Sequence, residues 1–398
     1  MSWIFTKFIV PLLVLGVLVL VHEFGHFIVA KWRKVGVLKF AVGFGPAILK
    51  FRKGETDYQI GIIPLGGFVR MVGDMPDPIT GTQEHDEKVR MLESVSPEEK
   101  ALLEDKSRWF IEKKVWERAA IVFAGPFFNL IMAILTVIFC VNLYGEPIPD
   151  DSATLGNVMI DSPGEQAGLK KGDLIKKIGD KEISSWSELA KTIHDGDGNT
   201  IRLLVTRDNA ELTIDAQPKA KTVSTITGEK KTYYMLGISP SDKIFHKDSD
   251  FINAIKIGFI WTLDKALLSY EGIWGMIGGK ISTDEIAGPI YILQTTGHKA
   301  EQSFEQLLYL TAILNVSLAV LNLLPIPILD GGHLFFYLLE LIGIHLSVRK
   351  KEIAQNVGLV LLLSLMVFAV KNDLTRKTPI EGKPTANFNN VGEDAPKK

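Results

Sequence analysis

Two histidines and a glutamate near the N-terminus are the residues of this chain best suited to chemistry. They form the sequence His22-Glu23-Phe24-Gly25-His26 at the end of an apolar run from Phe8 to Val21. In a helix, positions i and i+4 project from nearly the same side, so His22 and His26 can offer two ring nitrogens to one Zn²⁺ ion, with Glu23 beside the metal as a base. The plainer alternative is that these residues only mark a membrane boundary, but such groups are costly at bilayer depth unless they have a use.

A catalytic zinc site needs a third protein ligand and an open position for water. The best candidate is Asp330, in the segment Asn322-Leu323-Leu324-Pro325-Ile326-Pro327-Ile328-Leu329-Asp330-Gly331-Gly332-His333. The two prolines cannot continue a regular helix, so the chain must unwind there, and irregular backbone at membrane depth is tolerated where it lines a cavity in the protein. Without the histidine motif, Leu-Asp-Gly-Gly would be interpreted as an ordinary turn.

Other ligand sets have less support. His333 and Glu340 are rivals of Asp330, but both fall on the helix expected beyond the turn. The residues after His26 lack the glycine and third histidine of the pattern H-E-x-x-H-x-x-G-x-x-H. The nearest downstream glutamate, Glu55, falls in a glycine-rich region with β-forming residues. Asp330 therefore remains the favoured carboxylate.

The composition is that of membrane spans alternating with a soluble part. The chain has 398 residues, 46% of them hydrophobic, and its net charge of −2 does not point to nucleic acid as a partner. Its single cysteine, Cys140, cannot form an internal disulfide, so a metal site here must use histidines and carboxylates. The N-terminal apolar run superficially resembles a signal peptide, but no small-x-small cleavage site follows it, so we expect a retained span.

Four segments are long and apolar enough to position the motifs across a bilayer. We expect transmembrane helices at residues 1–30, 117–144, 305–345 and 352–371. Basic residues gather at one set of helix ends: Lys31, Arg33, Lys34, Lys39, Lys113, Lys114, Arg118, Arg349, Lys350 and Lys351. By the positive-inside rule these ends are cytoplasmic, which places the histidine motif toward the cytoplasmic side and the long region 145–306 outside.

The glycine-rich residues 31–80 predict a membrane-associated β-hairpin. A free edge of this hairpin, formed by Tyr58 to Phe68, could pair with an extended peptide and hold it over the metal, and a hairpin that only packs is an equal alternative. We expect a charged cytoplasmic segment without chemistry at 81–116, interfacial amphipathic helices at 245–304 and a disordered tail at 372–398. In the second span, Asn129 needs a polar partner, either in a neighbouring helix or at the active site.

Residues 151–220 predict a compact extracytoplasmic α/β domain. Asp173 to Ile178 is expected to form a strand, the helical face that begins at Trp186 follows it, and Ile201 to Arg207 begins a hairpin that turns at Asp208-Asn209. The stretch from Gly164 to Ile175, read Gly-Glu-Gln-Ala-Gly-Leu-Lys-Lys-Gly-Asp-Leu-Ile, resembles the signature of bacterial PDZ domains. The resemblance implies a groove for a peptide strand or a free C-terminus, with Leu155 to Val158 lining it. A spacer or steric filter is an equal alternative.

Together these motifs resemble the site-2 protease family, and most closely the bacterial regulator-of-sigma-E proteases. The resemblance rests on the H-E-x-x-H motif in the first span, Gly125-Pro126 with Asn129 in the second, the PDZ-like insert, and Asn322 to Pro325 leading to Leu-Asp-Gly. It covers the chain from the first span to the fourth in unchanged order. One difference is that many relatives carry two tandem PDZ domains, whereas this sequence shows one.

The resemblance implies an intramembrane zinc endopeptidase of the bacterial inner membrane that cuts single-pass membrane proteins, such as anti-sigma factors, and leftover signal peptides. It implies His22, His26 and Asp330 as zinc ligands and Glu23 as the catalytic base. Asn322 and Pro325 are implied to contact substrate, and so are Gly66 and Gly67, which would lie in the membrane-associated β region. The rival class is a non-enzymatic membrane protein, either a carrier with a His/Glu/Asp relay or a PDZ scaffold.

Overall fold

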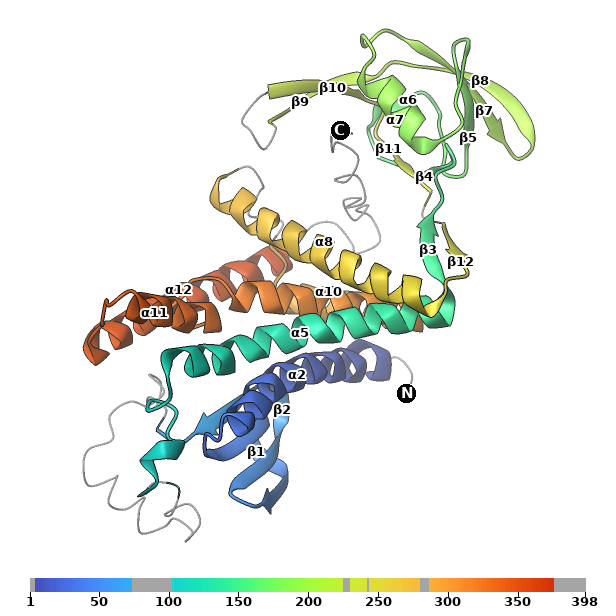
Figure 1. Cartoon of the computed structure of the whole chain (residues 1–398). Coiled ribbons are helices and arrows are strands. Elements are labelled where there is room, and N and C mark those ends of the chain that lie inside the picture. Colours follow the sequence, from blue (N-terminus) through green and yellow to red (C-terminus); the bar gives the residue numbers. More distant parts are fainter. Residues whose placement is uncertain are drawn as a thin grey trace. The chain divides into compact units, whose positions relative to one another are not determined.

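The structure is a computed structural model that describes residues 4–73, 102, 104–224, 230–241, 243–279 and 286–375. The chain divides into two compact units, one of residues 1–143, 250–274 and 282–377 and the other of residues 144–249, 275–281 and 378–398. Figure 1 labels their elements. Most of the charged segment expected at 81–116 and most of the tail expected at 372–398 lie outside the described residues.

The first unit is mainly helical, with one β-hairpin. Its elements are η1 (Phe5–Ile9), α2 (Val10–Trp32), β1 (Val37–Lys53), β2 (Thr56–Met71), η2 (Lys106–Arg108), α5 (Val115–Tyr144), α8 (Phe251–Ile277), α9 (Pro289–Gln302), α10 (Phe304–Asn322), α11 (Asp330–Leu341) and α12 (Val348–Thr375).

Four helical segments of the described chain are long and apolar enough to cross a membrane, which confirms the predicted number. They are Phe5–Trp32, Val115–Tyr144, Phe304–Asn322 and Val348–Thr375. The last of them is longer than expected, so residues 372–375, where we expected the tail to begin, are helical. The 27-residue helix α8 is not among the four, because Lys256, Asp264, Lys265 and Glu271 interrupt its apolar sequence.

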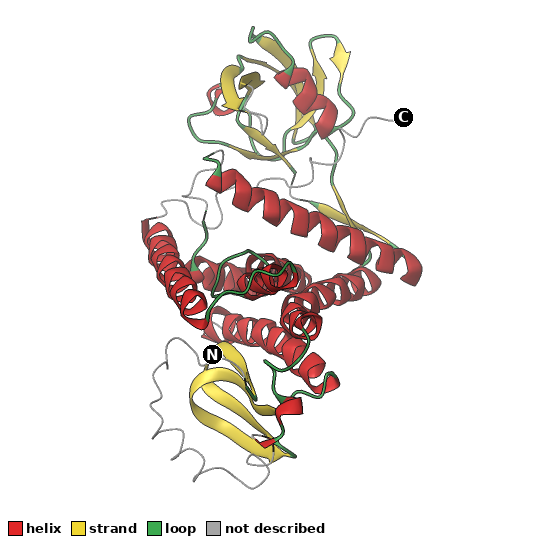
Figure 2. Cartoon of the chain, turned by 60° about the vertical axis from the view of Figure 1, so that its left-hand side comes forward, coloured by secondary structure: helices red, strands yellow, loops and turns green. Residues whose placement is uncertain are grey.

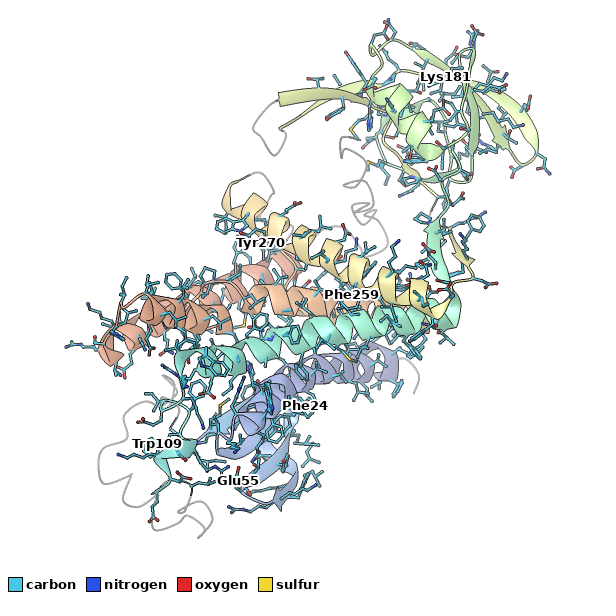
Figure 3. All side chains as sticks on the ribbon, viewed as in Figure 1. Phe24, Glu55, Trp109, Lys181, Phe259 and Tyr270 are labelled. Atoms are coloured by element: carbon cyan, nitrogen blue, oxygen red, sulfur yellow. The ribbon has the colours of Figure 1, made fainter. Side chains whose placement is uncertain are left out.

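Helix α8 presents large apolar side chains on its outer side. Phe259 and Tyr270 project from it in Figure 3 and are 58% and 49% exposed. The opposite side packs on α5 and α10, where Ala254 and Gly258 allow close approach.

The third expected span divides into two helices at its prolines. α10 ends at Asn322, residues 323–329 are irregular, and α11 begins at Asp330. The two glycines after Asp330 allow this break to be compact, because a Cβ atom on Gly331 would meet the carbonyl oxygens of Leu323 and Leu324 at 2.2–2.3 Å. The unwinding expected from the prolines is confirmed.

The β region is one hairpin of two long strands, β1 and β2. Both strands bend, so that their halves form four neighbouring strand segments of one sheet. Residues 37–42 pair on one side with 67–71 and on the other with 57–60, and residues 49–53 pair with the outer side of 56–60. Tyr58 to Ile60, the first part of the predicted edge of Tyr58 to Phe68, is therefore interior and offers no free edge, whereas Gly67 and Phe68 at its end lie on an outer segment. The bend turns the sheet so that its outer segments in the described chain are 47–53 and 67–71.

A partly buried charge cluster ties the hairpin to the end of α2. Glu55, in the hairpin turn, accepts two hydrogen bonds of 2.8 Å from Arg108 and one from Lys31. Partial burial acts to raise the pKa of Glu55, but the hydrogen bonds from Arg108 and Lys31 outweigh it and lower that pKa below its ordinary value. Figure 3 marks Glu55 and the neighbouring Trp109. Because Phe110 is also buried, the end of the segment expected to be solvated is packed instead.

The second unit is the α/β domain predicted from the sequence, with its strands and short helices seen in Figure 2. Its elements are β3 (Glu146–Pro149), β4 (Leu155–Val158), α6 (Pro163–Gln166), β5 (Leu174–Ile178), β6 (Lys181–Glu182), α7 (Trp186–His194), β7 (Ile201–Arg207), β8 (Ala210–Ala216), β9 (Lys219–Ser224), β10 (Lys230–Met235), β11 (Ile238–Pro240) and β12 (Ile244–Lys247). The predicted strand, helix and hairpin are confirmed as β5, α7 and β7–β8, with positive φ angles at Asp208 and Asn209 in the two-residue turn.

The glycine-aspartate signature of this domain has a structural reason. Gly168 and Gly172 adopt positive φ angles, which turns the chain back before β5. Asp173 is fully buried and accepts two hydrogen bonds of 2.7 Å from the Arg207 guanidinium and one of 2.8 Å from the backbone N–H of Lys170. The carboxylate thus joins the turn to β7.

The segment expected to line a groove is partly buried in this domain. β4 pairs with β11, and Leu155 is 1% exposed, so Leu155 itself lies in the core and not in a groove. A pocket instead lies between α7 and residues 235–238, with Trp186, Leu189 and Ile193 on the helical side.

Candidate active site

The H-E-x-x-H motif lies in the second half of α2, and the structure brings it against Asp330 of α11. The Nε2 atoms of His22 and His26 are 3.2 Å apart. Oδ2 of Asp330 lies 3.1 Å from Nε2 of His22 and 3.5 Å from Nε2 of His26. Among the described residues, these three form the group of possible ligands within 4.8 Å of one another.

The donor set fits a zinc ion. Three atoms with lone pairs converge, and Oδ2 of Asp330 is buried without a hydrogen-bond donor. Such an arrangement is costly unless a cation shares the site. Two imidazole nitrogens and one carboxylate oxygen match a catalytic zinc site that keeps one position open.

The orientation of His26 is fixed by α5. Nδ1 of His26 lies 2.9 Å from the backbone carbonyl oxygen of Ile121, which can only accept a hydrogen bond. The ring proton therefore sits on Nδ1 and leaves the lone pair of Nε2 directed at the site, the arrangement usual for histidine ligands. No feature of the sequence identifies Ile121, because its contribution is a backbone atom.

Asn129 orients the imidazole ring of His22. Its side-chain amide lies 3.3 Å from Nδ1 of His22, it is fully buried, and its Oδ1 atom has no partner. An amide turned by 180° has the same shape and presents Oδ1 to the Nδ1–H of His22, so that the ring N–H donates a hydrogen bond to Oδ1. Of the two roles open to Asn129, the structure favours orientation of the active site.

Small residues allow α2 and α5 to approach closely at this level. A Cβ atom on Gly25 would lie 2.4 Å from the carbonyl oxygen of Ala124, and one on Gly125 would lie 2.3 Å from Nε2 of His26. Side chains at these positions would push the helices apart or displace the ligand. In the sequence, this contact is indicated by Gly25 of the H-E-x-x-H motif and by Gly125 of the Gly125-Pro126 pair.

Glu23 faces the β-hairpin. A Cβ atom on Gly67 would lie 2.9 Å from Cγ of Glu23, so the outer strand segment crosses directly beside this carboxylate. Gly66 has a φ of 117° and leaves no space for a side chain beside the ring of Phe44. The structure therefore places Gly67 beside the motif, whereas Gly66 lies against the Phe44 ring.

The other two predicted substrate residues, Asn322 and Pro325, lie next to and within the irregular segment 323–329. Asn322 is the last residue of α10, and Pro325 is exposed. Within the described chain, the Asn322 side chain forms no hydrogen bond with His22, His26 or Asp330.

Glu340 has a different partner from the metal site. It accepts a hydrogen bond of 2.6 Å from Arg118 of α5, and the Arg118 guanidinium also lies 5.0 Å from the Tyr337 ring centroid. The pair links α5 to the helix that begins at Asp330. His333 likewise lies outside the ligand group and contacts Phe336.

Changing Glu340 to Gln should lower stability but leave zinc content unchanged. The pair is mostly buried, with side-chain exposures of 10% and 22%, so loss of the charged hydrogen bond should cost about 2 kcal/mol. Denaturation of the detergent-solubilised protein measures the first effect, and metal analysis of the folded fraction measures the second. A fall in zinc content per folded molecule would restore Glu340 as a ligand.

Changing Asn129 to Leu should weaken zinc binding by about 10–100-fold, because His22 would lose the group that orients it. Competition with a zinc chelator measures this affinity directly. The matched control is Asn142→Leu on the same helix, where the exposed amide bonds only the Ile138 carbonyl. Equal affinities in the two variants would show that Asn129 has no part in metal binding.

Comparison with known proteins agrees with this site. Residues 10–365 match the profile of Peptidase family M50. A protein of Agrobacterium fabrum named as a zinc metalloprotease is 32% identical over 376 residues, which cover 93% of this chain and 96% of the relative. Zinc metalloprotease RasP of Oceanobacillus iheyensis is 28% identical over 427 residues, covering 93% and 99%. The PDZ domain of the SdrC-like protein from Listeria monocytogenes is 22% identical over 24% of this chain and 93% of its own, with a TM-score of 0.19.

The fold is that of a multi-pass helical membrane protein with an α/β domain and a His-His-Asp group between its helices. The chain belongs to peptidase family M50, the site-2 protease family of zinc metalloproteases. It is thus an intramembrane zinc protease, and the alternative of a non-enzymatic carrier or scaffold no longer stands.

Proposed function

We propose that this protease binds its zinc through His22, His26 and Asp330 and uses Glu23 as the general base. The observation that carries the proposal is the convergence of the three ligand atoms, with Glu23 one residue from His22 and beside the outer strand segment. Zinc, when bound, supplies a Lewis acid that polarises the scissile carbonyl and makes water more acidic.

The chain's own residues handle the protons and the substrate. Glu23 takes a proton from the attacking water as the water oxygen bonds to the carbonyl carbon. It then gives that proton to the nitrogen as the C–N bond breaks, so one peptide bond and one water become an acid and an amine. Ile121 and Asn129 hold the two imidazoles in the orientation that this chemistry needs.

The substrates we propose are single-pass membrane proteins, of the kind that includes anti-sigma factors and leftover signal peptides. A transmembrane helix hides its carbonyls in hydrogen bonds, so the cleaved segment must first become extended. Residues 67–71 supply a strand whose outer side pairs with no other strand of the described chain. A substrate strand added there would pass beside Glu23, whereas Tyr58 to Ile60, the first part of the predicted edge, is paired on both sides.

Crosslinking tests where the substrate lies. A photoreactive residue at Phe68 in the Glu23→Gln enzyme should crosslink to a single-pass substrate, because Phe68 is on the segment beside Glu23. The same residue at Phe51, which is also exposed but on the opposite outer segment, should give only background. Equal crosslinking from both positions would exclude edge pairing at 67–71.

The orientation we propose follows the basic helix ends. The active site lies toward the cytoplasmic side of the inner membrane and the PDZ domain outside, with α8 at the interface. The PDZ pocket between α7 and residues 235–238 is apolar and suits a peptide strand or C-terminus. Membrane-protein fragments that accumulate with wild type but not with Glu23→Gln would identify the substrates, and identical fragment patterns would refute the function.

A further inference from the structure

Arg33 lies between two tryptophan rings at the end of two membrane helices. Its guanidinium carbon is 4.3 Å from the ring centroid of Trp32 and 4.2 Å from that of Trp116. Trp32 is the last residue of α2, and Trp116 is the second residue of α5. Each distance is within the range of a cation–π contact, so the two rings hold the guanidinium between the ends of the helices.

The edges of this guanidinium have no acceptor in the described chain. Nε of Arg33 is buried without a hydrogen-bond partner, and Arg33 forms no ion pair with a described residue. By contrast, the buried or half-buried arginines Arg108, Arg118 and Arg207 each bind a carboxylate. A guanidinium held between two rings, with donors that no acceptor of the described chain uses, is suited to bind an anion.

The surroundings favour an anion at a membrane surface. The tryptophans are 71% and 49% exposed, as is usual for indoles at the boundary between hydrocarbon and headgroups. Lys34, Lys113 and Lys114 adjoin Arg33 and Trp116 along the chain. The nearby carboxylate of Glu117 is engaged with the backbone N–H of Lys114.

We propose that Arg33, clamped by Trp32 and Trp116, binds the headgroup phosphate of an anionic phospholipid. The in-plane N–H groups of arginine match two phosphate oxygens, and stacking fixes the guanidinium in advance, so little rotamer freedom is lost on binding. Basic pockets between membrane helices are suited to anionic headgroups. The site lies outside the zinc centre, and it does not depend on the function proposed above.

Native mass spectrometry of the full-length, zinc-loaded protein tests the proposal. The protein is released from bilayers that contain phosphatidylglycerol and phosphatidylcholine with the same acyl chains, and the lipids that remain bound are counted. We expect wild type to retain more phosphatidylglycerol than phosphatidylcholine. In Arg33→Gln, the ratio of retained phosphatidylglycerol to retained phosphatidylcholine should fall about five-fold. The control is Arg349→Gln, which removes an exposed arginine at the start of α12 and should behave as wild type.

A second variant separates the stacked site from general charge. Trp116→Leu keeps Arg33 but removes one ring, and it should also reduce retention of phosphatidylglycerol, which provides the test if Arg33→Gln does not fold. Retention equal to wild type in Arg33→Gln, or in a folded Trp116→Leu, would overturn the proposal. Equal losses in Arg33→Gln and Arg349→Gln would also overturn it, because they would reflect net charge alone.

Discussion

Replacing Glu23 by Gln should abolish proteolysis while leaving zinc bound. The amide keeps the size of the carboxylate but cannot take a proton from water, and the three proposed ligands are unchanged. Loss of a general base lowers rates by about 10²–10⁴-fold. Cleavage of a reconstituted single-pass substrate measures the rate, and metal analysis of the same preparation measures the zinc.

The control for this variant is Glu271→Gln, which removes an exposed carboxylate from α8. It should cleave at the wild-type rate. Substantial turnover by Glu23→Gln would remove Glu23 from the mechanism. Loss of zinc in that variant would instead indicate that Glu23 acts on the metal site itself.

Replacing Asp330 by Asn should weaken zinc binding by more than about 100-fold. Loss of a group that only orients a ligand weakens zinc binding by up to about 100-fold, and loss of a ligand should cost more. The amide is neutral, so the two imidazoles would hold the dication without the compensating charge. Oδ2 of Asp330 also has no hydrogen-bond donor whose loss would explain a change in stability of the metal-free protein. Chelator competition measures the affinity, and the thermal midpoint of the metal-free form measures the fold.

The comparison variant is Asp264→Asn on α8, whose carboxylate is 54% exposed beside Lys265. It should bind zinc as wild type does. Unchanged zinc affinity in Asp330→Asn would remove Asp330 from the ligand set. A large loss of stability in the metal-free Asp330→Asn protein would point to a structural role instead.

The membrane spans could be predicted because hydropathy is a local property of the sequence. Each of the four segments carries its own apolar length, and the structure confirms all four. The elements of the α/β domain were predictable for the same reason, since Asp208-Asn209 and the helical face at Trp186 are local signals. The course of the hairpin was not, because the bend that places Tyr58 to Ile60 between two other strand segments depends on pairing that no local pattern of residues specifies.

The stretch from His22 to His26 determined by itself that two imidazoles would share one face of a helix, because the spacing fixes the geometry within one turn. The sequence also supplied Asp330 as a candidate, through the prolines that end a helix before it. Only the tertiary structure decided that this carboxylate lies 3.1 Å from His22, that the Ile121 carbonyl and Asn129 orient the rings, and that Glu340 is bound to Arg118. These contacts join helices separated by about a hundred to three hundred residues, so they follow from packing between helices and not from any local pattern.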